Sequence, residues 1–179
     1  MSLNLEEIKE TRKQLLEEIE QEFIDELIPA KIVPDEDIGM PVLSILFDDL
    51  AAEGLENLGE FFFMPTINPD EDMQIFTNII TILEEMDDGR LPELAMAIAI
   101  LNGLIPIGSF AIDAADGTLI YRHSYEMPIS FEKETLKDCV ELAMGAAADT
   151  VSKFAYMLVE VNEGERSAAS VFDYFIAGE

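Results

Sequence analysis

Apolar residues recur at three- and four-residue steps along three segments of the chain, which predicts three helices. In the first segment, residues 5–28, Glu and Lys lie opposite the apolar face, and Pro29 ends the pattern. That apolar face is expected to consist of Leu5, Ile8, Leu15, Ile19, Phe23 and Leu27.

The second and third predicted helices follow further along the chain. Residues 91–102 carry Pro92 in the first turn and are followed by Gly103, a typical helix stop; because they are nearly all apolar, deep burial is expected. The last helix is expected to start near Ser130 as its N-cap and to end at Asn162 and Gly164. Its apolar stripe is Leu136, Val140, Ala143, Ala147, Val151, Phe154, Leu158 and Val161.

Shorter apolar runs separated by Gly and Pro predict strands at residues 42–50, 56–67 and 72–86. The last of these runs also fits helical spacing, and both interpretations of residues 73–86 stay open. Strand is favoured because residues 79–82 are all β-branched. Residues 30–41, with Pro34, Gly39 and Pro41, are expected to form a loop or linker.

Residues 108–128 predict a β-hairpin. Phe110 and Ile112 alternate with smaller or polar residues, and Leu119, Tyr121 and the only histidine, His123, alternate in the same way. The Asp-Gly pair at residues 116–117 would supply the positive φ angles of a tight turn.

Together these elements predict an α+β fold in which an antiparallel sheet of about five strands packs against long N- and C-terminal helices, in the order α-β-β-β-α-β-β-α. We expect a single domain over residues 1–179. It would have an N-terminal helix at 1–29, a core at 40–161, and a C-terminal tail or short helix at 165–179.

Several motifs in this order resemble those of a known family. They are an Asn-Gly helix ending, a strand closing in F-x-I-D, a D-G-x-L-x-Y-R return strand and a long final helix. They resemble the YbjN-like sensory transduction regulators and the type III secretion chaperone-like fold, over roughly residues 40 to 160. The resemblance implies a small acidic domain, commonly dimeric, that acts through protein contacts. It brings no catalytic residues with it.

The composition narrows the function classes. Apolar residues make up 49% of the chain, and 38 Asp and Glu against 10 Lys and Arg give a formal net charge of -28. Such a charge repels nucleic-acid phosphates and anionic lipid surfaces, so we expect neither partner. Lacking a secretory pattern at its start and carrying one cysteine, the chain is expected to be cytoplasmic.

Candidate chemistry is sparse. His123 and Cys139 could imitate a nucleophilic pair, but one falls mid-strand and the other on the apolar side of a helix, so no enzymatic activity is expected. The acidic clusters at residues 35–37 and 70–72 fail the EF-hand spacing, and one His with one Cys cannot build a zinc shell. We therefore expect no cofactor and no metal, with solvated acidic loops.

Three features indicate an interaction surface. Between Lys31 and Arg90 there are 15 Asp and Glu and no Lys or Arg, which either steers basic partners or serves solubility alone. Three consecutive phenylalanines in a strand must point to both faces of the sheet. One face can pack on the helices, and the other would be covered by this chain's own elements or by a partner. Small residues in the last helix allow another helix to approach closely. The possible partner or dimer surface is Phe61, Phe62, Phe63, Met64, Gly145 and Ala146.

These observations favour a non-enzymatic protein-interaction or chaperone-like module that binds a polypeptide partner, as a homodimer. An acidic ligand-binding or cation-binding sensor is the alternative.

Overall fold

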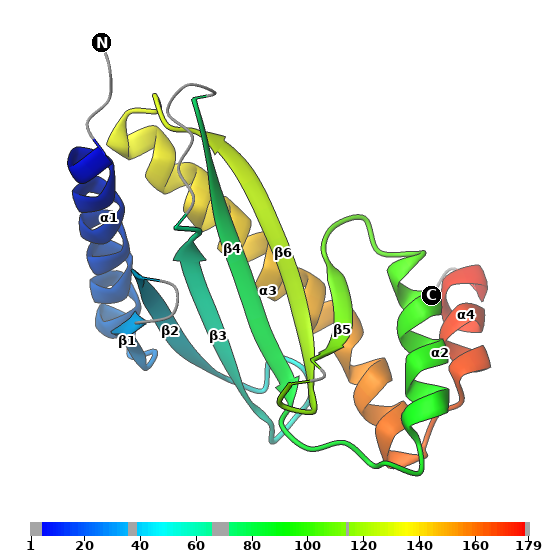
Figure 1. The fold of residues 1–179 in the computed structure, drawn as a ribbon. Helices are drawn as coiled ribbons and strands as arrows, with labels where there is room; N and C mark the ends of the chain where they lie inside the picture. Colours follow the sequence, from blue (N-terminus) through cyan, green and yellow to red (C-terminus); the bar gives the residue numbers. More distant parts are fainter. Residues whose placement is uncertain (1–4, 36–38, 66–71, 114, 178–179) are drawn as a thin grey trace. The chain divides into compact units, whose positions relative to one another are not determined.

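A computed structural model describes residues 5–35, 39–65, 72–113 and 115–177, and it has the α+β architecture that the sequence predicts (Figure 1). Six strands form one antiparallel sheet in the order β1-β2-β3-β4-β6-β5. The elements are α1 (Leu5–Asp25), β1 (Ala30–Asp35), β2 (Met40–Asp48), β3 (Glu56–Phe63), β4 (Met73–Leu83), α2 (Leu91–Asn102), β5 (Ser109–Asp113), β6 (Thr118–Pro128), α3 (Lys133–Glu163) and α4 (Ala168–Ala177).

The chain forms two compact units. The first comprises residues 1–47, 58–78 and 124–146, and the second comprises residues 48–57, 79–123 and 147–179. Strands β4 and β6 and helix α3 contribute residues to both. The expectation of a single domain stays a prediction.

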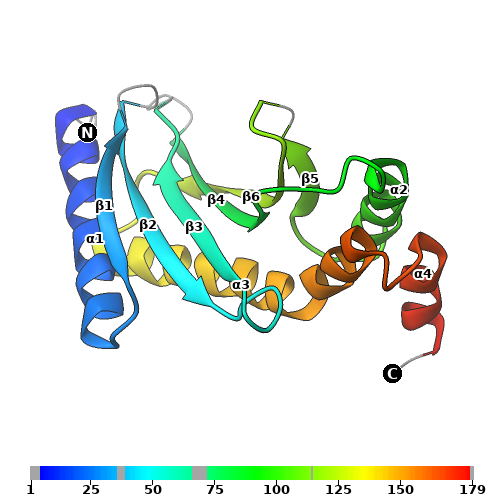
Figure 2. The same cartoon turned by 90° about the horizontal axis from the view of Figure 1, so that it is seen from below.

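In the first unit, α1 and the first half of α3 pack on one face of the strands (Figure 2). Three aromatic rings link α1 to this face: Phe23 meets Phe47, and Phe47 meets Phe61, each edge to face with ring centroids 6.4 Å apart. Gly59 makes that contact possible, because a Cβ there would lie 2.7 Å from both the Phe47 and Phe61 rings.

Strand β1 lies where the sequence predicts a loop. It pairs with β2 in antiparallel register, from Ala30 opposite Ile45 to Asp35 opposite Met40. The proline at position 34 argues against a central strand, but an edge strand tolerates it because its outer side needs no ladder hydrogen bond. On that outer side a Glu20 carboxylate oxygen accepts the Ile32 N–H at 2.7 Å, so α1 closes the edge.

Helix α1 ends three residues earlier than its periodicity predicts. The Ile28 N–H donates to the Phe23 carbonyl at 2.8 Å and the Leu27 N–H donates to the Ile24 carbonyl at 3.0 Å, which is the Schellman pattern. Leu27 occupies the left-handed position of that motif with φ 65°. It is 90% exposed, so its expected place on the buried face is wrong.

The last helix does not start at Ser130. Ser130 instead donates both its N–H, at 2.8 Å, and its hydroxyl, at 2.5 Å, to the Asp72 carboxylate. Helix α3 begins three residues later at Lys133 and ends at Glu163, before Gly164 at φ 81°. Its predicted stripe is buried, apart from the half-buried Phe154.

In the second unit, the hairpin of β5 and β6 is confirmed, but its turn is longer than predicted. Asp113 pairs with Thr118, so four residues separate the strands. Gly117 alone of the predicted turn pair has a positive φ, at 72°, and its N–H donates to the Asp113 carbonyl at 2.8 Å. Residue 114 lies outside the described residues.

Helix α2 buries one face, where the sequence predicts burial all round. Leu94, Ala97, Ile98 and Leu101 are buried, whereas Met96 is 60% exposed. The helix packs against α4. Of the two expectations for residues 165–179, a tail or a short helix, the structure has the helix. Because alanines make up much of the outer face of α2, exposing that face costs little.

Asn102, the last residue of α2, closes the outer edge of β5. Its amide nitrogen donates to the Phe110 carbonyl at 2.9 Å, and its amide oxygen accepts the Phe110 N–H at 2.8 Å. The side chain thus replaces both hydrogen bonds of a missing neighbouring strand.

Replacing Asn102 by Ala should therefore destabilise the protein by about 1–3 kcal/mol, since two backbone groups lose their partners. Urea unfolding measures the change. Asn102→Asp, which keeps the acceptor but sets a carboxylate oxygen against the Phe110 carbonyl at the C-terminus of α2, should be destabilised at least as much as Ala; an unchanged midpoint in both variants would contradict this role.

Candidate functional site

Arg12 is a charged residue in the middle of the buried face of α1. Arg12 is 0% exposed. The other residues on that face of α1 are also buried: Ile8, Leu15, Leu16 and Ile19. The helix thus brings a guanidinium into the packing between α1 and the strands of the first unit.

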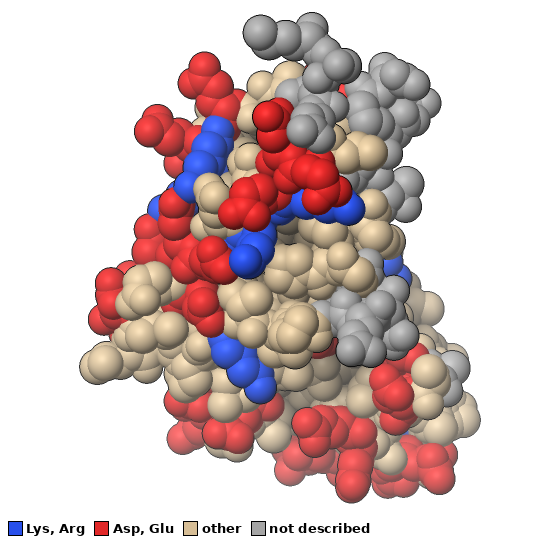
Figure 3. All heavy atoms as spheres, turned by 60° about the vertical axis from the view of Figure 1, so that its left-hand side comes forward, with Lys and Arg blue, Asp and Glu red and all other residues tan. Residues whose placement is uncertain are grey.

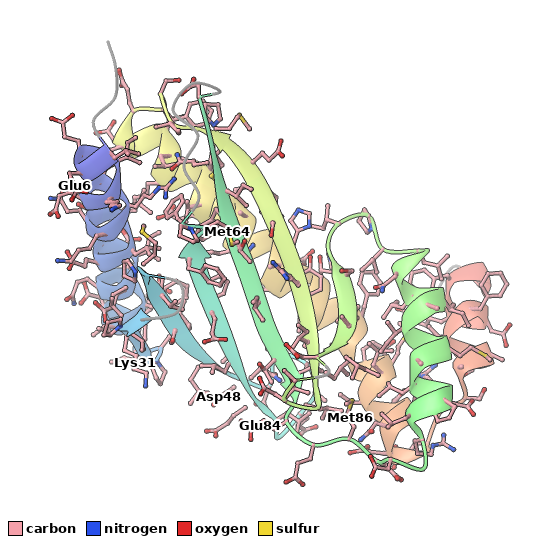
Figure 4. The ribbon with its side chains drawn as sticks, viewed as in Figure 1. Glu6, Lys31, Asp48, Met64, Glu84 and Met86 are labelled. Atoms are coloured by element: carbon pink, nitrogen blue, oxygen red, sulfur yellow. The ribbon has the colours of Figure 1, made fainter. Side chains whose placement is uncertain are left out.

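The guanidinium is held by neutral groups. Its Nε donates to the Gln74 amide oxygen at 2.9 Å, its Nη1 donates to the Met64 carbonyl at 3.3 Å, and its Cζ lies 4.9 Å from the centroid of the Phe63 ring. Gln74 in turn donates to the Pro128 carbonyl at 3.1 Å. Figure 4 shows Met64 where β3 ends, next to β4.

The third guanidinium nitrogen of Arg12 lacks a partner. Its Nη2 is buried and makes no hydrogen bond, and among the described residues no carboxylate pairs with the guanidinium. Burial disfavours the charged form and lowers the pKa of Arg12 to about 10, so the group still carries its charge at neutral pH. An uncompensated buried cation is costly, and such groups are normally paired.

A cavity of about 290 Å³ lies beside this group, and we call it the Arg12 cavity. Arg12, Gln74 and the buried apolar residues Ile8, Ile129 and Leu136 line its inner part. Its outer part includes the exposed residues Glu7 and Ser130, so the cavity is open to solvent.

A second hollow of about 340 Å³ lies on the first unit and is lined by Pro29, Ala30, Lys31, Ser44, Leu46 and Leu58; we call it the apolar hollow. Leu58 is 37% exposed at its edge. The strained and exposed Leu27 comes two residues before the first lining residue. Figure 4 shows Lys31 at the β1 side of this region.

The predicted contact residues divide into two groups. Phe61, Phe62 and Phe63 are 0%, 6% and 0% exposed, so this chain's own elements cover them and they offer no contact area in the monomer. Met64 is half-buried, and its carbonyl accepts a hydrogen bond from Arg12 Nη1.

Gly145 and Ala146, by contrast, lie on the outer side of α3. Gly145 is exposed, and a Cβ added there would meet no atom within 4 Å. Leu142, one helical turn earlier, is 75% exposed, while Ala146 is half-buried.

His123 lies mid-strand in β6, as predicted, and desolvation by burial lowers its pKa. Cys139 is a half-buried free thiol on α3. Within the described part of the chain, no group of three His, Cys, Asp or Glu could hold a metal ion. Most of the acidic clusters at 35–37 and 70–72 lies outside the described residues.

Acidic side chains spread over the face drawn in Figure 3, with Lys and Arg among them and an uncharged area near its centre. Two lysines of α3 are already paired: Lys133 with Glu18, and Lys137 with Glu22 and Glu141. The hydrogen bond to Glu22 raises the pKa of Lys137.

Sequence reasoning missed Arg12, although the chain carries a signal for it. The apolar steps of α1 run through Ile8 and Leu15, seven residues apart, and regular helical spacing requires a buried residue between them at position 12. The signal is therefore a charged residue, Arg12, at a position where the helical spacing requires a core residue.

Comparison with known proteins finds likeness in structure and not in sequence. No protein-family model and no curated protein matches the chain. The crystal structure of YbjN from E. coli, proposed to be a transcription regulator, covers 77% of this chain and 89% of its own at 11% identity and a TM-score of 0.41. A likeness at this level is too low to transfer a role. In the described residues, no helix has the length and apolar character to span a bilayer.

Replacing Leu27 by Gly should stabilise the protein by about 1 kcal/mol, because glycine adopts the left-handed position without the Cβ penalty. Leu27→Ala is the matched control: it removes the exposed side chain but keeps the strain, and should change stability by less than about 0.5 kcal/mol. Equal unfolding midpoints for Gly and Ala would show that the backbone strain costs nothing.

Proposed function

We propose that this chain is a non-enzymatic module that binds a polypeptide partner and associates as a homodimer. The observation that carries the proposal is Leu27, a large apolar side chain held 90% exposed in a strained backbone, two residues before the first residue that lines the apolar hollow. The fold has no need of leucine there, and backbone strain that persists is typical of binding sites.

The apolar hollow suits one or two anchor side chains of an extended polypeptide. Its lining is mostly apolar, and the end of α1 beside it carries the exposed acidic residues Asp25 and Glu26. Apolar contact supplies affinity, while flanking carboxylates select partners and speed their association. A partner with an aliphatic or aromatic anchor between Lys or Arg residues therefore fits this surface best.

A displayed library of random peptides tests the polypeptide site. Selection on the wild-type protein should enrich apolar anchors flanked by Lys or Arg, and Leu58→Glu should weaken binding of the selected peptides at least about tenfold, a loss of about 1.4 kcal/mol. Met96→Glu, the same change at another exposed apolar residue, should leave binding unchanged. The site would be refuted if selection enriched no such peptides, or if the selected peptides bound Leu58→Glu as tightly as the wild type.

Self-association is best supported on the outer side of α3. Leu142 projects from it, and the space around Gly145 allows a second helix to approach closely. Glycine in a helix interior costs about 0.5–1 kcal/mol relative to Ala, and the neighbourhood within the monomer gives no reason for that cost. At the β1 edge, Glu20 already accepts the outward-facing Ile32 N–H. The face of α3 is therefore more available for contact with a second subunit than the edge of β1.

Light scattering after gel filtration tests the dimer. The wild type should be dimeric at micromolar concentration, and Leu142→Glu should be monomeric with an unchanged unfolding midpoint. Gly145→Ala should stabilise the isolated subunit by about 0.5–1 kcal/mol and weaken the dimer. A wild type that is monomeric throughout, or a dimer that survives Leu142→Glu, would refute this interface.

A cation sensor has no supporting cluster within the described residues. A ligand sensor has one specific observation in its favour, the Arg12 cavity. The absence of nucleic-acid and membrane partners remains part of the proposal, supported by the net charge of -28.

A further inference from the structure

We propose that the Arg12 cavity binds a small organic monocarboxylate, whose carboxylate contacts Arg12 Nη2 and whose apolar body fills the inner part of the cavity. This site is separate from the apolar hollow and does not depend on polypeptide binding.

The need for an anion follows from the surroundings of the guanidinium. Nε and Nη1 have neutral acceptors, Nη2 has none, and the buried charge has no carboxylate partner in the part of the chain that the structure describes. Lys133, the other cation lining the cavity, already pairs with Glu18. A charge-assisted hydrogen bond from Nη2 to a bound anion would satisfy the donor and compensate the charge together.

The lining favours a carboxylate over a phosphate. The buried residues Ile8, Ile129 and Leu136 line the same cavity as the guanidinium. They can contact the apolar part of an organic carboxylate, which inorganic phosphate lacks. Glu7 at the outer part and the net charge of -28 repel a dianion more strongly than a monoanion. A volume of about 290 Å³ restricts the ligand to a small molecule.

The path into the cavity passes residues that are exposed. Glu7 and Ser130 line the outer part, and the Ser130 hydroxyl is already engaged by Asp72. Arg12 lines the cavity, but its Nη2 is buried, so contact with a bound carboxylate requires a local shift of the side chains that cover this nitrogen.

Titration calorimetry on the full chain with hexanoate, hexanamide and inorganic phosphate tests the assignment. Hexanoate should bind with a dissociation constant below about 1 mM and raise the melting temperature. Hexanamide, which has the same body without the charge, should bind at least about tenfold more weakly. Phosphate binding as tight as hexanoate, or equal binding of acid and amide, would overturn the proposal.

Arg12→Met should abolish hexanoate binding, whereas Lys13→Met, which removes an exposed charge one position along α1, should bind like wild type. Thr11→Phe enlarges a residue that lines the cavity and keeps Arg12, so it should also abolish binding and serves as the test if Arg12→Met fails to fold. Hexanoate binding that survives Thr11→Phe, or a loss in Lys13→Met equal to that in Arg12→Met, would refute the site.

Discussion

The burial of the Arg12 guanidinium among neutral groups is the constraint on which the first unit depends. One side chain joins α1 to the end of β3 through Met64 and to β4 through Gln74, and Gln74 extends the connection to the Pro128 carbonyl of β6. The Phe63 ring covers the cation. Aliphatic packing would stabilise this junction with less desolvation, so a charge kept there indicates a use beyond stability.

Both outer strands have outward-facing backbone groups satisfied by side chains. Glu20 accepts the Ile32 N–H of β1, and Asn102 bonds both polar groups of Phe110 in β5. Unpaired strand edges invite addition of another strand, and these two side chains oppose it. These two closures are the reason why the proposed protein contacts are placed on side-chain surfaces, the apolar hollow and the outer face of α3.

Sequence reasoning succeeded where a strong local pattern and the tertiary environment agree. The hairpin, the strand at residues 73–86 and the long α3 follow from periodicity and from glycines that end elements. It failed where a tertiary partner overrides the local signal. β1 persists despite Pro34 because it lies at an edge, and Ser130, whose N–H and hydroxyl donate to Asp72, lies before the start of α3 at Lys133.

The candidate sites were harder to predict than the fold. Aromatic content drew attention to Phe61, Phe62 and Phe63, which the chain buries itself. Gly145 and Ala146 were selected because small residues let a second helix approach closely, and that contact stays a prediction. Arg12 was missed because its meaning depends on which face of α1 is buried, and the polar partners that define it come from β3 and β4, more than fifty residues away.

A carbon-13 NMR titration of the arginine Cζ resonances follows the charge of each guanidinium directly, with Arg12→Met assigning the resonance of interest. A cation buried without an anionic partner should lose its proton with a midpoint near pH 10. A guanidinium of Arg12 that keeps its proton to as high a pH as the exposed Arg122 contradicts the account.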